Sequence, residues 1–133
     1  MWDMFKGCSK LTDLYINNFD TSQVTDMESM FEGCSNLFSL NISNFNTTNV
    51  QYMNKMFYNC SSLKSINLNS WDTSMVSTMK QMFYECSSLI SLDISGFDTE
   101  KVRDLSGMFK GLSSLENLDL HTFNTKTCNA FNE

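Results

Sequence analysis

The stretch MFEGCSNLFSLNISNF, residues 30–45, is one of five similar stretches whose starts lie 26 residues apart. The others are MFKGCSKLTDLYINNF from residue 4, MFYNCSSLKSINLNSW from residue 56, MFYECSSLISLDISGF from residue 82 and MFKGLSSLENLDLHTF from residue 108. A fixed period of roughly 20 to 50 residues is typical of stacked units that bury their apolar faces against neighbouring units. The sequence therefore predicts one repeat array over residues 1–133.

The second half of each unit carries the pattern of a strand. Leu40 and Ile42 alternate with polar Ser39, Asn41 and Ser43, which is the two-residue period of a strand with one buried face. The same alternation recurs in every unit. We therefore expect strands near residues 13–17, 39–43, 65–69, 91–95 and 117–121.

The segment between two such strands carries a helical pattern. Apolar residues recur there at three- and four-residue intervals, as in Val24, Met27, Met30, Phe31 and Cys34. Thr21 and Ser22 precede this run and can accept hydrogen bonds from free N–H groups. Gly33 stands where a left-handed residue would end a helix, although Glu85 occupies the same place in its unit. This pattern predicts helices near residues 23–32, 49–58, 75–84 and 101–110.

Two motifs resemble a known repeat family. The Leu-x-x-Leu-x-Ile pattern of residues 37–42 resembles the strand segment of the leucine-rich repeat. The Met-Phe-x-x-Cys-Ser-x-Leu block of residues 30–37 resembles BspA-like leucine-rich-repeat surface proteins, and the full unit is similar to the repeat of bacterial and mycoplasma-type surface lipoproteins. Phe45 and its equivalents depart from the pattern, because standard leucine-rich repeats carry an asparagine there.

The resemblance implies both a fold and a role. The implied fold is an α/β repeat, a right-handed leucine-rich-repeat-type solenoid of about five 26-residue coils, each with a short strand and a short helix. The implied role is adhesion to host or matrix proteins, displayed at the cell surface or secreted. The first residues, MWDMFKGCSK, carry no signal-peptide pattern, and we expect the chain to be part of a longer array.

Composition excludes several classes of partner. The formal net charge is −6, and the nine lysines and arginines are scattered along the chain, which argues against nucleic acid and anionic membrane surfaces. No run of about 18 apolar residues is present, so we expect no direct insertion into a membrane. The methionines and phenylalanines fall mainly in the repeated apolar columns, which favours a core role over a cofactor site.

The cysteines form one column in the repeat: Cys8, Cys34, Cys60 and Cys86, with Leu112 in the fifth place. Replacement by leucine favours buried core thiols over ligands or nucleophiles. Disulfides and a zinc site are the alternatives, but a column at 26-residue spacing does not converge as zinc ligands do. We expect no metal and no cofactor. Cys128 replaces a valine of the other units and is expected in the core too.

A second polar column is formed by Asp or Asn followed by Thr: Asp20–Thr21, Asn46–Thr47, Asp72–Thr73, Asp98–Thr99 and Asn124–Thr125. The favoured interpretation is an Asx-type turn followed by a helix cap, with the threonine hydroxyls bonding between coils. A calcium ladder is the alternative. The glycine-rich turn of calcium-binding β-helices is absent.

The sequence predicts no catalysis, because His121 is the one histidine and no phosphate loop or nucleophile motif accompanies it. Outward strand positions are instead the predicted protein-binding face: Tyr15, Asn41, Asn67, Asp93 and Asp119, with Ser39, Ser65 and Ser91. Exposed Tyr58 and Tyr84 are further candidates. Alternatively these small polar residues merely solvate a strand, and the tyrosines merely stack.

The predicted function is therefore a non-catalytic protein-binding or adhesion module. The alternative is an intracellular structural scaffold repeat that assembles with itself or binds other proteins. The first and last coils of an array expose apolar faces and strand edges, so end-to-end self-association is also expected. Trp2 and Phe131 are the residues expected to cover the two ends.

Overall fold

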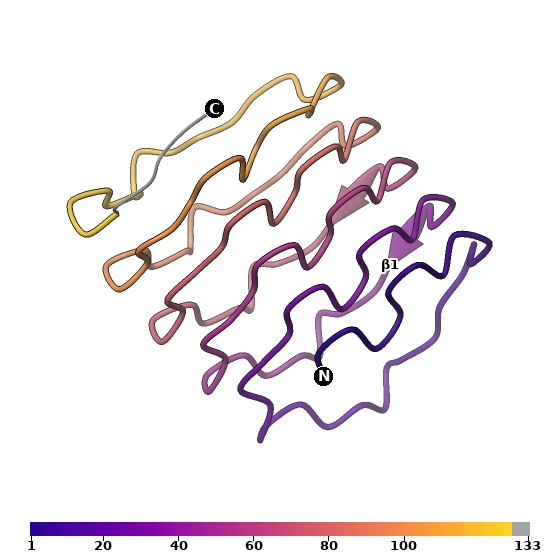
Figure 1. Ribbon diagram of the computed structural model, residues 1–133, viewed down its shortest axis with the longest axis horizontal. Helices are drawn as coiled ribbons and strands as arrows, with labels where there is room; N and C mark the ends of the chain where they lie inside the picture. The colour runs from indigo at the N-terminus through magenta and orange to yellow at the C-terminus, as the bar shows by residue number, and fades with distance from the viewer. Residues whose placement is uncertain (129–133) are drawn as a thin grey trace.

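The computed structural model describes residues 1–128, which wind into coils stacked side by side in chain order (Figure 1). Two short strands, β1 (Ser39–Leu40) and β2 (Ser65–Ile66), pair in parallel, with Ser39 opposite Ser65 and Leu40 opposite Ile66. Isolated parallel bridges continue the same register on another side of the stack, between Asp26 and Tyr52, Tyr52 and Thr78, and Thr78 and Asp104. Each paired residue therefore lies one 26-residue repeat from its partner.

The segment around the Met-Phe pair forms a hydrogen-bond ladder between coils. Every second N–H donates to a carbonyl of the next coil at 2.8 to 3.0 Å: Met27 to Tyr52, Ser29 to Asn54, Phe31 to Met56 and Gly33 to Tyr58. The intervening N–H groups close tight turns within the coil, as Cys34 does by donating to the Phe31 carbonyl at 3.1 Å. Successive N–H groups therefore alternate between closing a turn within the coil and donating to a carbonyl of the next coil.

The helices predicted near residues 23–32, 49–58, 75–84 and 101–110 are wrong. Among residues 1–128 the structure has no helix. Ser29, Lys55, Gln81 and Gly107, one in the middle of each predicted helix, have φ between 53° and 63°. A left-handed residue interrupts a right-handed helix, and half of the N–H groups are engaged between coils. The three- and four-residue spacing of the apolar side chains arises from successive turns.

The predicted strands are mostly wrong as well. The segments 39–43 and 65–69 shorten to β1 and β2, and the segments 13–17, 91–95 and 117–121 form no strand. The alternation of burial does hold, since Leu40 and Ile42 are buried between exposed neighbours. Asn41 explains the early end of β1, because its Oδ1 accepts from the Ser43 N–H at 3.2 Å and turns the chain.

The prediction of an α/β leucine-rich-repeat-type solenoid, with a strand and a helix in each coil, is therefore wrong. The structure is a stack of coils built from turns, with one two-stranded sheet in the described residues. Turns suit this sequence because the inter-coil ladder satisfies the backbone groups that a helix would satisfy internally.

The core consists of like residues stacked on like. The rings of Phe5, Phe31, Phe57 and Phe83 lie 5.5 to 5.7 Å apart and within 9° of parallel. The methionines and leucines that recur in the apolar columns of the inner units are buried beside them, whereas Met75, in another column, is exposed. Trp71, the one tryptophan in the closing aromatic column, packs on Phe57 at 6.3 Å. Burial of the repeated methionine and phenylalanine columns is confirmed for these inner units.

Buried threonine hydroxyls tie each coil to the next. The Thr47 hydroxyl donates to the Asp72 carbonyl at 2.9 Å and accepts from the Asp72 N–H at 2.9 Å. Thr21, Thr73 and Thr99 repeat this pair of bonds. The predicted Asx turns and inter-coil hydroxyl bonds are confirmed, whereas the predicted helix cap is wrong.

A column of left-handed residues ends each Met-Phe segment. It comprises Gly7, Gly33, Asn59, Glu85 and Gly111, with φ between 56° and 82°. The predicted left-handed conformation of this column is confirmed, and Glu85 adopts it despite its side chain. At the ends of the stack, Trp2 is 64% exposed and is not among the side chains that pack against the core, and Phe131 lies outside the described residues.

We expect Thr47→Val to lower the free energy of unfolding by about 2 kcal/mol, because it leaves the Asp72 N–H and carbonyl without partners. Thr48→Val is the matched control, since the neighbouring hydroxyl is exposed and bonds to Asn46 of its own turn. Chemical denaturation followed by circular dichroism measures both variants. Equal midpoints for Thr47→Val and Thr48→Val would contradict the ladder.

We expect Gly33→Ala to cost about 1 kcal/mol, because an L side chain disfavours the left-handed conformation. The added Cβ meets no atom closer than 3.5 Å, so the cost is conformational and not steric crowding. Gly96→Ala is the control, since its φ is not in the left-handed region and its Cβ would meet open space. Thermal denaturation that ranks Gly96→Ala as the less stable variant would overturn this explanation.

Candidate functional site

The residues of the predicted binding face all point outward. Tyr15 is 87% exposed, and the other members of the face are exposed as well: Ser39, Asn41, Ser65, Asn67, Ser91, Asp93 and Asp119. They form two columns: Ser39, Ser65 and Ser91 in one, and Tyr15, Asn41, Asn67, Asp93 and Asp119 in the other. In each coil a buried residue, such as Leu40 or Leu92, separates the two columns. We call these residues, with Asn117, the polar face.

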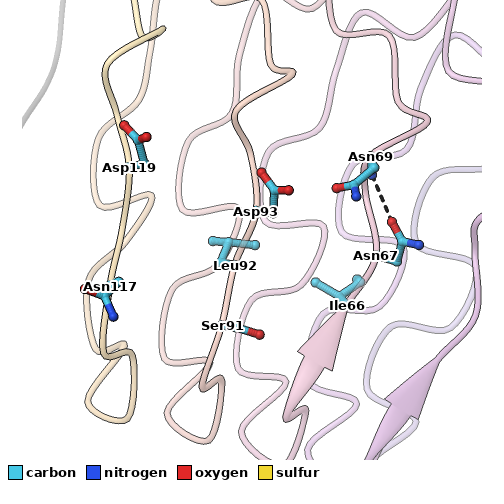
Figure 2. Close-up of a pocket in the computed structure, with 8 residues that line it drawn as sticks. All are labelled: Ile66, Asn67, Asn69, Ser91, Leu92, Asp93, Asn117 and Asp119. Atoms are coloured by element: carbon cyan, nitrogen blue, oxygen red, sulfur yellow. Dashed lines mark hydrogen bonds between the residues drawn. The ribbon is translucent and has the colours of Figure 1, made fainter.

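A shallow groove of about 470 Å³ crosses the later coils of the polar face (Figure 2). Asn67, Ser91, Asp93 and Asp119 line it, as the predicted face requires. Asn117, which continues the serine column, also lines the groove. The structure therefore brings residues from three successive coils together at one site.

A smaller groove, of about 170 Å³, lies at the other end of the polar face. Tyr15 lines it together with Ser39 and Asn41 of the next coil, and Asp13 completes its polar rim. Tyr15 takes the place that Asn or Asp has in later coils, so this end of the face is aromatic whereas the other end is acidic.

Four members of the polar face have a structural role in their own turns. The Oδ1 atoms of Asn41, Asn67, Asp93 and Asp119 each accept from the backbone N–H two residues later, at 2.9 to 3.2 Å. These Asx turns hold each side chain in one orientation. Within residues 1–128, the Oδ2 atoms of Asp93 and Asp119 receive no hydrogen bond, so they are available to a ligand.

Two of these side chains carry negative charge. Hydrogen bonds from the Ser95 hydroxyl and N–H lower the pKa of Asp93, against smaller opposing effects from burial and from the charge of Asp119. Hydrogen bonds from the N–H and ring of His121 lower the pKa of Asp119. His121 Nδ1 lies 2.7 Å from Asp119 Oδ1 in an exposed pair. Both carboxylates are therefore ionised at neutral pH.

Tyr58 and Tyr84 lie away from the polar face grooves. Their rings stack at 4.8 Å and 5°, and both side chains are half-buried. Lys55 Nζ lies 5.7 Å from the Tyr58 ring centre, and Lys110 Nζ lies 6.0 Å from that of Tyr84. The two rings therefore stack on each other and contact their flanking lysines. This is the stacking arrangement that the sequence left open as the alternative to a binding site.

The central cysteines are buried thiols. Cys34, Cys60 and Cys86 are fully inaccessible, and each Sγ donates to a phenylalanine carbonyl of the preceding coil at 3.0 to 3.2 Å. The core prediction is confirmed for these three, whereas Cys8 is exposed and Cys128 half-buried. Within residues 1–128, no group of three or more His, Cys, Asp or Glu side chains is placed to hold a metal ion.

Burial makes these thiols unreactive. It raises the pKa of Cys34 to about 11 and that of Cys86 to about 12, from an ordinary value of 9.0. The pKa of Cys60 is raised as well, again mainly by burial. The thiolate is the nucleophilic form, so the column has little of it at neutral pH.

We expect a thiol-specific disulfide reagent to modify Cys8 first in the native protein, and Cys34, Cys60 and Cys86 only on unfolding. Absorbance of the released product against time counts the fast and slow thiols, with denatured protein as the reference. Three or more fast thiols in the native protein would be incompatible with the buried column, because only Cys8 and Cys128 lie outside it.

The same thiols make stability depend on alkaline pH. Their folded-state pKa values are raised, so their contribution is complete below about pH 9 and is lost as the pH rises towards 11 to 12. A variant with alanine at Cys34, Cys60 and Cys86 starts less stable, and we expect a shallower decline above pH 9. Parallel curves for the two proteins, from denaturation at stepped pH, would contradict this.

A third groove, of about 520 Å³, lies outside every predicted site. Its lining includes Tyr52, Met75, Lys101 and Arg103 from successive coils. One feature of the sequence could have pointed to this groove: Met75 and Lys101 share a column with the neutral polar residues Gln23, Asn49 and Thr127. That feature marks a difference between repeats, but it does not show which columns lie side by side.

These features define a repeat protein with a stacked core and shallow surface grooves. A family model described as "Mycoplasma protein of unknown function, DUF285" matches residues 1–87 and 62–133, and the chain belongs to this family. The two matches share residues 62–87, which is one 26-residue repeat. No curated protein and no solved structure matches the chain.

The family match corrects the resemblance drawn from the motifs. The assignment to BspA-like leucine-rich-repeat surface proteins is wrong, because the chain matches the model of a different family and no leucine-rich-repeat family. The short Leu-x-x-Leu-x-Ile pattern misled because alternating apolar residues also suit a turn-rich coil. Among residues 1–128, no helix is present that is long and apolar enough to cross a membrane.

Proposed function

We propose that this chain is a non-catalytic protein-binding module whose polar face holds a basic segment of a partner protein. The observation that carries the proposal is the pair Asp93 and Asp119, which are ionised side chains on neighbouring coils of one groove. Their Oδ2 atoms have no donor among the described residues, and a lysine or arginine of the partner would supply one.

The Asx turns support this proposal. A side chain that is already held by an internal hydrogen bond loses little conformational entropy when a ligand binds. Asn67, Asp93 and Asp119 are held in this way on three successive coils. The face thus offers polar groups at the regular spacing of the stack, about 4.8 Å from coil to coil.

The overall charge supports a basic partner too. With a net charge of −6, the chain attracts a basic segment over long range, which favours rapid association at low salt. A host or matrix protein is the partner that the motif resemblance implied, and this stays a prediction. Display at the cell surface, the alternative of an intracellular scaffold, and end-to-end association stay predictions.

The test is binding of the chain to immobilised matrix and serum proteins, measured by surface plasmon resonance at two salt concentrations. The variant Ser65→Lys/Ser91→Lys/Asn117→Lys places three cations on the polar face without touching an Asx turn. We expect it to weaken binding about tenfold or more, a loss of about 1.4 kcal/mol. Ser62→Lys/Ser88→Lys/Ser114→Lys, which adds the same charge in another column, is the control.

A second variant separates charge from folding. Asp93→Asn/Asp119→Asn keeps the Oδ1 acceptors of both turns and removes both negative charges. We expect it to fold normally and to lose the salt-sensitive part of the binding. Binding that is equal in all variants, or no binding to any tested protein, would count against the polar face as the site.

A further inference from the structure

The third groove lies between two outward columns of the stack. One column contains Met75 and Lys101, and the other contains Gln51, Ser77 and Arg103. They flank the buried Val76 and Val102, so side chains two residues apart point outward on the same side. We call the surface formed by the following six residues the basic groove: Gln51, Tyr52, Met75, Ser77, Lys101 and Arg103.

Backbone hydrogen bonds hold the floor of the basic groove. The Ser77 N–H donates to the Gln51 carbonyl at 2.9 Å, and the Arg103 N–H donates to the Ser77 carbonyl at 2.9 Å. The Ser77 hydroxyl also donates to the Gln51 carbonyl, at 3.0 Å. Ser77 is thus a small, fixed side chain between two long ones, which explains the hollow at this place.

The cations of the basic groove lack acidic partners. Within residues 1–128, no carboxylate lies within 4.0 Å of the Lys101 or Arg103 side chains, whereas Lys6 pairs with Asp3 and Glu32. Asp72 is influenced by Lys101, but only as the smallest contribution to the lowering of its pKa. Glu100 also lines the groove. The groove therefore carries two positive charges and one negative charge, in a chain of net charge −6.

Apolar surface lies beside these cations. Tyr52 and Met75 are each 43% exposed, among the most exposed large apolar side chains of the inner coils. Lys101 Nζ lies 3.2 Å from Met75 Sδ, so the ammonium group and the thioether form one surface. A ligand for this groove therefore needs both an apolar group and an anionic group.

We propose that the basic groove binds an acidic segment of a partner protein, in which an apolar side chain adjoins a carboxylate. Arg103 would hold the carboxylate by a two-pronged contact, and Lys101 would add charge. The apolar side chain would cover Tyr52 and Met75. A nucleic acid or sulfated polysaccharide fits less well, because such polyanions need many cations and the rest of the chain repels them.

The basic groove is opposite in charge to the polar face and shares no residue with it. The proposal is therefore independent of the polar face function. One partner with segments of both charges, or two partners, would satisfy the two sites.

The experiment is a titration of the ¹⁵N-labelled chain with a peptide of about eight residues that alternates glutamate with leucine and serine, a length sufficient to cross the groove. We expect amide shifts at Gln51, Ser77 and Arg103. Arg103→Ala should weaken binding about tenfold. Lys10→Ala and Lys64→Ala remove exposed cations elsewhere and should change little.

Three results would overturn the proposal. The first is the absence of shifts around Ser77 at millimolar peptide, and the second is equal binding of the same peptide with glutamine in place of glutamate. The third is stronger binding of heparin than of the peptide at this groove, which would show a polysaccharide site. Ser65→Lys/Ser91→Lys/Asn117→Lys should leave the shifts intact, which separates this groove from the polar face.

Discussion

The hydrogen bonding between successive coils is the constraint on which the rest of the structure depends. In the Met-Phe segment every second N–H donates a hydrogen bond to a carbonyl of the next coil. Thr47 and its equivalents extend this bonding through a buried hydroxyl that both donates and accepts. Because these groups are satisfied between coils, the chain needs neither a helix nor a wide sheet to bury its backbone.

This bonding dictates what each column can contain. Coils stacked in exact register place each residue on its own equivalent, so the core accepts side chains that pack well on copies of themselves. Phenylalanine rings stack nearly parallel, and thiols are small enough to bond the carbonyl of the preceding coil. The same requirement explains the cysteines of the inner coils, which are buried core residues whose thiols bond to the preceding coil.

The surface follows a different rule, since nothing requires an exposed column to repeat. Asp93 and Asp119 end a face that begins with Tyr15, and Lys101 and Arg103 occur in columns that are otherwise uncharged. Differences between repeats therefore place charged and aromatic side chains at particular points of the surface, whereas the buried columns differ little from coil to coil. Two grooves of opposite charge on one acidic chain are the result.

The sequence by itself determined the 26-residue period, the buried columns, the Asx turns and the outward direction of the polar face, because each depends on local spacing and on repetition. It did not determine the absence of helices. Met27, Met30, Phe31 and Cys34 have helical spacing, but the partner of each N–H is chosen by the neighbouring coil. Only the tertiary structure decided that Ser29 is left-handed and that Met75, Ser77 and Arg103 share one groove, since both depend on contacts between coils.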